Sequence, residues 1–222
     1  MDSKIFKTLE YQKILNKLSH YAQTATGQQT ALRLQPSDDL EHIKKMLKGT
    51  DEAYAADRLK GVPSFNGVVD ITPAVKRARI GGTLSPQELL GIRTTVQAAR
   101  RIQVYVASLH EENPVETLLY WSEQLSEQRG LENSIKGCID ENAEVLDSAS
   151  TELSQIRREL RSGEVRIREK LDSMIRSSTV SKMLQDQLIT IRGDRFVIPV
   201  KAEYSSYFGG IVHDQSGSGA TL

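Results

Sequence analysis

A regular stripe of apolar positions runs through a highly charged stretch between residues 147 and 183, where no proline interrupts it. Apolar steps of three and four residues are the heptad spacing that keeps one side of a helix against a partner helix. We therefore predict one long helix from Asp147 to about Met183, roughly 50 Å long at about 1.5 Å per residue. The stripe consists of Leu146, Ala149, Leu153, Ile156, Leu160, Ile167 and Met174.

The heptad pattern is incomplete, because Gly163 and Lys170 occupy positions that a coiled coil fills with apolar side chains. A self-sufficient coiled coil is therefore not expected. We predict a lever helix that packs along part of its length and projects from, or bridges, the rest of the molecule.

Amphipathic helical patterns fill the sequence before this helix. The first runs from Ile5 to about Gln23 with Thr8 as its cap, and a short helix follows from Thr24 to Leu34, before Pro36. A break with a short hairpin is expected from Leu131 to Leu146. The remaining helix-start signals are a capping box at Asp38 and Glu41, Pro73, the Ser85-Pro86-Glu88 box, and Asn113-Pro114-Glu116.

The last forty residues have a different pattern, with short β-branched runs around turn residues. Leu188–Ile191 and Phe196–Val200 flank the four residues 192–195, which predicts a β-hairpin. Residues 211–213 resemble a third strand, residues 215–219 a turn, and residues 220–222 the start of a fourth strand. Because that strand has no room to finish, we expect a fragment of a longer chain.

These patterns predict a mainly α fold. Its expected parts are a helical core domain over residues 1–130, a connector and long lever helix over 131–184, and a small, truncated antiparallel β region over 185–222.

Composition adds two constraints. The 29 basic and 29 acidic side chains balance, so no global field attracts nucleic acid or membrane. The single cysteine, Cys138, excludes an intramolecular disulfide framework, and no apolar run reaches the roughly 20 residues of a membrane span. We expect a cytoplasmic protein without a membrane partner.

Candidate catalytic chemistry is sparse. The glycines at 209, 210, 217 and 219 are not followed by the Lys-Ser/Thr pair of a phosphate-binding P-loop, and the histidines stand singly along the sequence. Cys138 has no neighbouring histidine, which favours a packing role. We therefore predict no catalytic, cofactor-binding or metal-binding residue in this chain.

The charge is distributed unevenly. Residues 109–147 are strongly acidic, whereas basic residues outnumber acids on the long helix that follows. One interpretation is a solvated face with intrahelical ion pairs. The other is a surface that follows a phosphate backbone without reading sequence. The candidate nucleic-acid-binding residues are Arg157, Arg158, Arg161, Arg166, Arg168 and Lys170.

Several long strings point to a known family. They are ITIRGDRFVIPVK at residues 189–201, GIVHDQSGSGATL at 210–222, FNGVVDI at 65–71, RARIG at 77–81 with LSPQEL at 84–89, and SMIRSS at 173–178. In these strings the chain closely resembles the MutS-two family, the second bacterial MutS-like paralogue. Residues 26–34 and 43–53 also resemble the opening of the MutS core domain, with Gln28 where a lysine is usual.

The resemblance implies a homodimeric protein with a helical core and lever, a clamp region, an ABC-type ATPase domain that uses ATP and Mg²⁺, and a C-terminal Smr endonuclease domain. The family's roles are suppression of recombination on branched DNA and rescue of collided ribosomes. This chain resembles only the N-terminal core, the lever and the entry to the clamp region. The implied partners are therefore DNA, the ribosome with its rRNA, or both, and the enzyme activity would belong to the parent protein.

A competing hypothesis is a stand-alone helical or coiled-coil module for protein interaction. A gene that continues into a P-loop downstream of Leu222 would favour the family hypothesis over this one.

Overall fold

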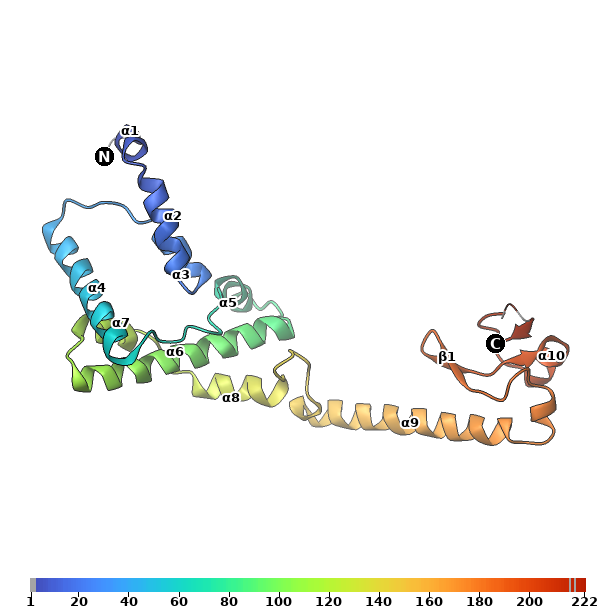
Figure 1. The fold of residues 1–222 in the computed structure, drawn as a ribbon. Helices are drawn as coiled ribbons and strands as arrows, with labels where there is room; N and C mark the ends of the chain where they lie inside the picture. Colours follow the sequence, from blue (N-terminus) through green and yellow to red (C-terminus); the bar gives the residue numbers. More distant parts are fainter. Residues whose placement is uncertain (1–2, 216, 218) are drawn as a thin grey trace. The chain divides into compact units, whose positions relative to one another are not determined.

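The computed structural model describes residues 3–215, 217 and 219–222. The chain forms two compact units, residues 1–149 and 150–222, and helices dominate its element order (Figure 1). The prediction of a mainly α fold with a small antiparallel β region is confirmed. Among the described residues, no helix has the length and apolarity that crossing a membrane requires.

Three short helices open the first unit: α1 (Ser3–Thr8), α2 (Tyr11–Tyr21) and α3 (Ala25–Leu32). The prediction of one helix from Ile5 to Gln23 is wrong, because Glu10 adopts a left-handed backbone conformation (φ 51°) that separates α1 from α2. Thr8 lies at the end of α1, where its hydroxyl donates to the carbonyl of Lys4 instead of capping a helix. The next helix follows prediction, since Thr24 caps α3 by accepting from the amide of Gly27 at 3.0 Å.

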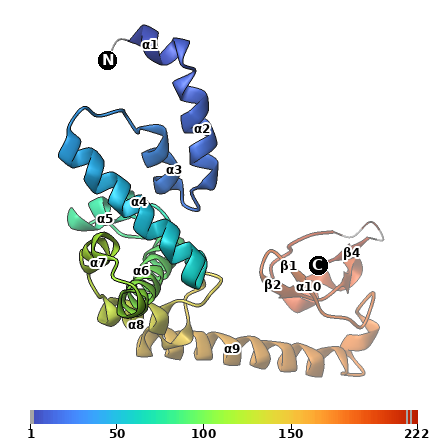
Figure 2. The ribbon, with the colours of Figure 1, turned by 60° about the vertical axis from the view of Figure 1, so that its left-hand side comes forward.

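The rest of the first unit is built from α4 (Leu40–Lys60), α5 (Thr72–Arg79), α6 (Pro86–Glu112), α7 (Glu116–Glu123) and α8 (Arg129–Cys138). Helix α7 packs against both α4 and α6, and α8 packs along α6 (Figure 2). Helix α6 therefore contacts both of the helices that follow it in the sequence.

The start signals were partly correct. The Ser85 capping box is confirmed: the Ser85 hydroxyl accepts from the amide of Glu88 at 3.3 Å, and the Glu88 carboxylate accepts from the amide of Ser85 at 2.9 Å. The box predicted at Asp38 is wrong, because the N-cap of α4 is Asp39. Asn113 ends α6 and does not start α7.

The break predicted over residues 131–146 is wrong for its first half, which belongs to α8. The glycines that suggested it, Gly130 and Gly137, lie where an added Cβ would meet nothing within 4 Å, and α8 buries Glu132 and Ile135. The predicted hairpin is reduced to one antiparallel bridge between Ile139 and Val145. A 3₁₀ turn, η1 (Asp147–Ala149), then ends the unit.

Two apolar clusters form the core of the first unit. One joins α5, α6, α8 and the segment after α8, residues 139–146, which we call the connector, and the other joins α4, α6 and the start of α7. The connector therefore packs into the core and does not loop away from it. The buried members are Ala74, Ile92, Ile135, Ile139 and Ala143 in the first cluster, and Ala56, Val106, Leu109 and Val115 in the second.

A buried carboxylate fixes α7 to α4. Glu52 of α4 is 8% exposed, and its Oε2 accepts from the amides of Thr117 at 2.8 Å and Leu118 at 3.0 Å. Amides in the first turn of a helix lack intrahelical partners and attract negative charge. Glu52 thus caps α7 from a distant point in the sequence.

Beside this cap, Lys48 and Glu116 form an ion pair at 2.5 Å that also joins α4 to α7. The hydrogen bond between them lowers the pKa of the Glu116 carboxyl and raises the pKa of the Lys48 ammonium. The pair is exposed, so its contribution to stability is small.

The second unit begins with α9 (Thr151–Ile175), which Ser150 caps by accepting from the amide of Leu153 at 3.0 Å. The helix predicted from Asp147 to Met183 is therefore too long at both ends. Its 25 residues span about 38 Å at about 1.5 Å per residue. The chain turns after Ile175, because Ile175 joins a small core with Leu184 and Val200, and a 3₁₀ turn, η2 (Val180–Lys182), lies between them.

The predicted β-hairpin is confirmed as β1 (Thr190–Arg192) and β2 (Arg195–Val197), which pair antiparallel. Gly193 and Asp194 between them have φ values of 52° and 61°, as a two-residue hairpin turn of type I′ requires.

The rest of the β region is only partly as expected. β3 (Val200–Lys201) pairs with β4 (Ala220–Thr221), which confirms a strand at the end of the chain, and α10 (Ser205–Phe208) lies between them. The third strand predicted over residues 211–213 is wrong. Ile211 and Val212 are exposed there, and β3 takes the place beside β4. The turn predicted over residues 215–219 includes Ser216 and Ser218, which lie outside the described residues.

Candidate nucleic-acid interface

All six predicted basic residues lie on α9, in the stretch that Figure 1 colours orange. Arg157 is half-buried, and Arg158, Arg161, Arg166, Arg168 and Lys170 are exposed. Since successive residues of an α-helix are turned by about 100°, the position in the sequence fixes the side of the helix on which each one lies.

This geometry divides the six residues into two groups. Arg157, Arg161 and Arg168 fall within a sector of about 40°, which we call the arginine flank. Arg166 and Lys170 lie on roughly the opposite side of the helix, and Arg158 lies between the two groups. The six residues therefore do not form one continuous basic stripe.

The arginine flank is suited to phosphate contacts. Guanidinium groups stay charged at any physiological pH and donate through a planar fork that matches phosphate oxygens. Arg157 and Arg168 are about 16 Å apart along the helix axis, which corresponds to about five phosphates of one DNA strand. Such contacts position a nucleic acid but do not read its bases.

An apolar sector adjoins the arginine flank. Ile156, Leu160 and Ile167 fall within another sector of about 40°, and they are 47%, 61% and 51% exposed. A surface helix normally turns such a stripe toward a core. The sector therefore provides a second, apolar contact surface on the same helix.

Sequence reasoning missed two further basic residues in the second unit. Arg192 and Arg195 lie directly opposite each other at the tip of the β1–β2 hairpin, and Arg192 is 3.9 Å from the carboxylate of Asp214. The available signal was the Gly-Asp turn with an arginine on each side. These residues add cationic groups to the unit that carries the arginine flank.

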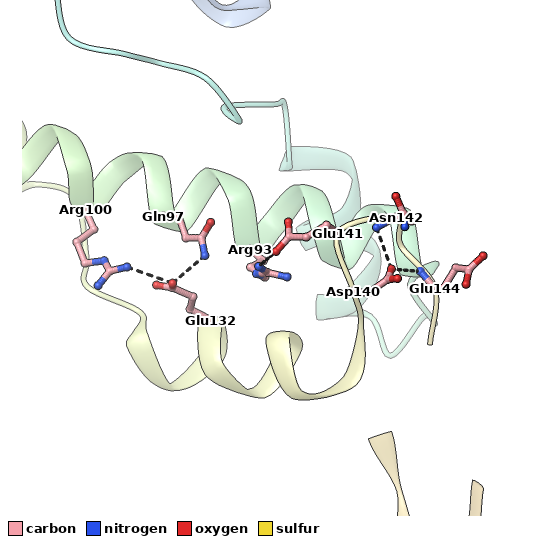
Figure 3. Close-up of polar contacts among 8 residues, drawn as sticks. All are labelled: Arg93, Gln97, Arg100, Glu132, Asp140, Glu141, Asn142 and Glu144. Atoms are coloured by element: carbon pink, nitrogen blue, oxygen red, sulfur yellow. Dashed lines mark hydrogen bonds and ion pairs between the residues drawn. The ribbon is translucent and has the colours of Figure 1, made fainter. Parts of the chain in front are cut away.

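The first unit contains a line of polar contacts along α6 that ends in the connector before α9 (Figure 3). Gln97 and Arg100 of α6 both donate to Oε1 of Glu132, at 2.9 and 3.1 Å. Arg93, 4% exposed, pairs with Glu141 of the connector at 2.5 Å. The Arg93 Nε is also buried and has no hydrogen-bond partner among the described residues.

The connector is held by its own turn as well (Figure 3). The Asp140 carboxylate accepts from the amides of Asn142 and Glu144, both at 2.8 Å, while Ala143 adopts a left-handed backbone conformation with φ 62°. The amide of Leu146 then donates to the carbonyl of Cys138 at 2.8 Å. These bonds make the connector an ordered end to the first unit, immediately before the chain enters α9.

The described residues contain no group of three or more His, Cys, Asp or Glu side chains that could hold a metal ion. The sequence also lacks the GxxxxGK[ST] string of a nucleotide-binding P-loop.

The chain is similar over its whole length to curated proteins that share one name. No protein-family model matches the chain. The curated protein named Endonuclease MutS2 of Brevibacillus brevis is 48% identical over 222 residues, and that of Geobacillus kaustophilus is 48% identical over 223 residues. The Putative endonuclease MutS2 of Bacillus subtilis is 44% identical over 223 residues. Each match covers 100% of this chain and 28% of the relative's length.

Proposed function

Because this chain is related over its full length to the MutS2 endonucleases, we propose that it forms the N-terminal core and lever part of a MutS2-type protein. In this proposal the chain binds nucleic acid and transmits movement, and it carries no catalytic site. The observation that carries the proposal is the full-length match at 42–48% identity to proteins of that name.

The nucleic-acid role is supported by α9. Its arginine flank carries three permanently charged groups on one side of the helix, and the relatives are named endonucleases. A flank that contacts phosphates suits both a branched DNA and the rRNA of a ribosome. We propose these two as the candidate targets.

The coupling role is supported by the connector. Its bonds to α6 and α8, including the pair between Arg93 and Glu141, hold the residues that immediately precede the Ser150 cap of α9. A helix of 25 residues is suited to act as a lever in a domain movement. ATP and Mg²⁺ would act in such a protein through residues outside this chain.

We further propose that the parent protein is a homodimer in the cytoplasm. The single cysteine agrees with a reducing compartment.

The experiment compares two triple variants that remove the same charge from different sides of α9. Arg157, Arg161 and Arg168 are changed to Gln in the first variant, and Arg158, Arg166 and Lys170 in the second. Binding to a four-way DNA junction is measured as a function of salt concentration. Three lost phosphate contacts would reduce the slope of log K against log salt by about 2.7, and we expect this only for the first variant.

Equal slopes for the first variant and the unmodified chain would contradict a role for the arginine flank. Binding of the full-length protein to junctions and to collided ribosomes, compared at one salt concentration, decides between the two targets.

A second candidate function rests on the exposed apolar sector of α9. In a stand-alone interaction module, Ile156, Leu160 and Ile167 would be covered by a partner helix in a coiled coil. That function predicts a stable oligomer by sedimentation that Leu160→Glu dissociates, together with no binding to the junction at any salt concentration. A P-loop encoded downstream of Leu222 would argue against it.

A further inference from the structure

A hollow of about 520 Å³ lies between α6 and the start of α8, entirely within the first unit. Its size is within the range of about 300–1,000 Å³ that is usual for sites that bind small groups. Helices α6 and α8 pack against each other (Figure 2), and the side-chain amide of Gln103 donates to the carbonyls of Ser122 at 3.3 Å and Leu125 at 2.7 Å. These contacts hold the walls of the hollow in place.

Three arginines line this space, which we call the arginine hollow. Arg100 and Arg101 belong to α6, and Arg129 is the first residue of α8. Among the described residues that line the hollow, Glu127 is the only acidic one. The N-terminus of α8, which no side chain caps, adds the positive end of a helix dipole to the same rim. The balance of charge in the arginine hollow therefore favours an anion.

Two of the arginines have carboxylate partners but keep most of their donors. The Arg129 Nε donates to Glu127 at 2.6 Å, and the Arg100 Nη2 donates to the buried Glu132 at 3.1 Å (Figure 3). A guanidinium carries five N–H groups. The bond to the carboxylate uses one nitrogen in each case, so both side chains can still donate to a ligand.

Arg101 differs from the other two arginines. Its side chain is exposed, and its Nη2 donates to the carbonyl of Asn66 at 2.5 Å, which is a neutral acceptor. No ion pair joins Arg101 to an acidic side chain within residues 3–215, 217 and 219–222. Its positive charge is therefore available to an anion.

The floor of the arginine hollow is small and apolar. Val104, 65% exposed, and Ala107 lie one and two turns beyond Arg100 on the same side of α6. A bound peptide would bring N–H groups that need acceptors, but the carboxylate of Glu127 already accepts from Arg129, and a peptide is usually anchored by larger apolar or aromatic side chains in deeper pockets. A sugar–phosphate backbone instead brings acceptor oxygens for the arginines and the C–H face of a sugar for the floor.

We propose that the arginine hollow binds a phosphate group of a nucleic-acid backbone. In this arrangement Arg101 and Arg129 donate to the phosphate oxygens, and the adjoining sugar lies over Val104. Guanidinium groups match phosphate oxygens through their planar fork of donors. The proposal rests on the proposed nucleic-acid function, and it adds a phosphate contact on the first unit to the arginine flank on the second.

Two double variants of the whole chain test this contact. Arg101 and Arg129 are changed to Gln in the first variant, and the control changes Arg58 and Arg79, two exposed arginines of the same unit outside the arginine hollow. Far-UV circular dichroism establishes that both variants are folded. Binding to the four-way DNA junction is measured as a function of salt concentration. Loss of one phosphate contact should lower the slope of log K against log salt by about 0.9, in the first variant only.

Arginine footprinting locates the contact on the unmodified chain. Phenylglyoxal modifies accessible guanidinium groups, and mass spectrometry identifies the modified residues. We expect the junction to slow the modification of Arg101 and Arg129 and to leave that of Arg58 and Arg79 unchanged. Inorganic phosphate and polyglutamate, each at the same ionic strength, should protect neither pair.

The inference is overturned if the two double variants have equal slopes, or if the junction does not protect Arg101 and Arg129. Protection by inorganic phosphate equal to that by the junction would assign the arginine hollow to a free anion. Equal protection by polyglutamate would assign it to an acidic protein. Either of these results also overturns the inference.

Failure of this inference can be told apart from failure of the proposed function. If the variant of the arginine flank lowers the slope and the variant of the arginine hollow does not, only the phosphate contact on the first unit fails. If the chain does not bind the junction at low salt, both proposals fail.

Discussion

Replacing Glu52 should destabilise the first unit by a predictable amount. This carboxylate accepts from the amides of Thr117 and Leu118, and it is 8% exposed. A hydrogen bond to a charged group contributes about 1.5–3 kcal/mol, and loss of an N-cap costs about 0.5–2 kcal/mol. These values describe the same contact and do not add, so we expect Glu52→Ala to lower the free energy of unfolding by about 3 kcal/mol.

Glu52→Gln separates charge from hydrogen bonding. The amide oxygen can still accept from one or both of the freed N–H groups of α7, but its interaction with the helix dipole is weaker. We expect a loss of about 1–2 kcal/mol, which is roughly half the effect of Glu52→Ala.

Urea unfolding followed by Trp121 emission measures both values, because Trp121 lies on α7 and therefore reports on the first unit. Asp51→Ala is the control, since it removes an exposed acid from the adjacent position of α4 and should change stability by less than about 0.5 kcal/mol. A loss below about 1 kcal/mol for Glu52→Ala would refute the argument that this carboxylate caps α7.

Three further predictions concern other contacts. In urea unfolding followed by far-UV circular dichroism, Gly49→Ala should lower the free energy of unfolding of the first unit by about 1 kcal/mol, since overpacking outweighs the gain in helix propensity. Gly163→Ala, where a Cβ meets nothing within 4 Å, should raise that of the second unit by up to about 1 kcal/mol. A gain for both would contradict the close packing at Gly49. Burial raises the pKa of Tyr105 in the folded state above its unfolded value of about 10. The contribution of Tyr105 to the free energy of unfolding is therefore fully present below about pH 10 and is lost as the pH rises through the folded-state pKa. Stability of the unmodified chain and of Tyr105→Phe should therefore converge at alkaline pH, and parallel curves would refute this. Glu141→Ala leaves the buried guanidinium of Arg93 without its carboxylate and should cost about 1–3 kcal/mol, and Arg93→Met in the same chain should recover part of that loss in a double-mutant cycle.

The features that sequence predicted well are those decided within a few residues. The Ser85 box depends on two groups three positions apart, and the β1–β2 hairpin depends on a Gly-Asp turn between two β-branched runs. Both were predicted correctly, because the whole interaction lies inside one short window.

The errors arise where distant residues decide. The first helix breaks at Glu10, which adopts a left-handed backbone conformation although no glycine or proline stands there to indicate one. The lever helix ends at Ile175 because the side chain of Ile175 packs with Leu184 and Val200 in a small core.

The same difference between local and distant interactions applies to the candidate site. The basic residues of α9 could be found from composition, but the pair between Arg93 and Glu141 joins residues 48 positions apart.

The number of residues in helix α9 fixes the angle around the helix axis between the arginine flank and Ile175, as well as the distance between them. Its last residue, Ile175, belongs to the core beneath the β region, and its arginine flank begins at Arg157, so an uninterrupted helix joins the two. Inserting one residue between them would rotate the flank by about 100° around the axis while moving it only about 1.5 Å along it. Insertions or deletions of seven residues would nearly preserve this angular relation. In natural variants of α9, length changes should therefore occur in steps of whole heptads if the flank and the β region contact the same nucleic acid.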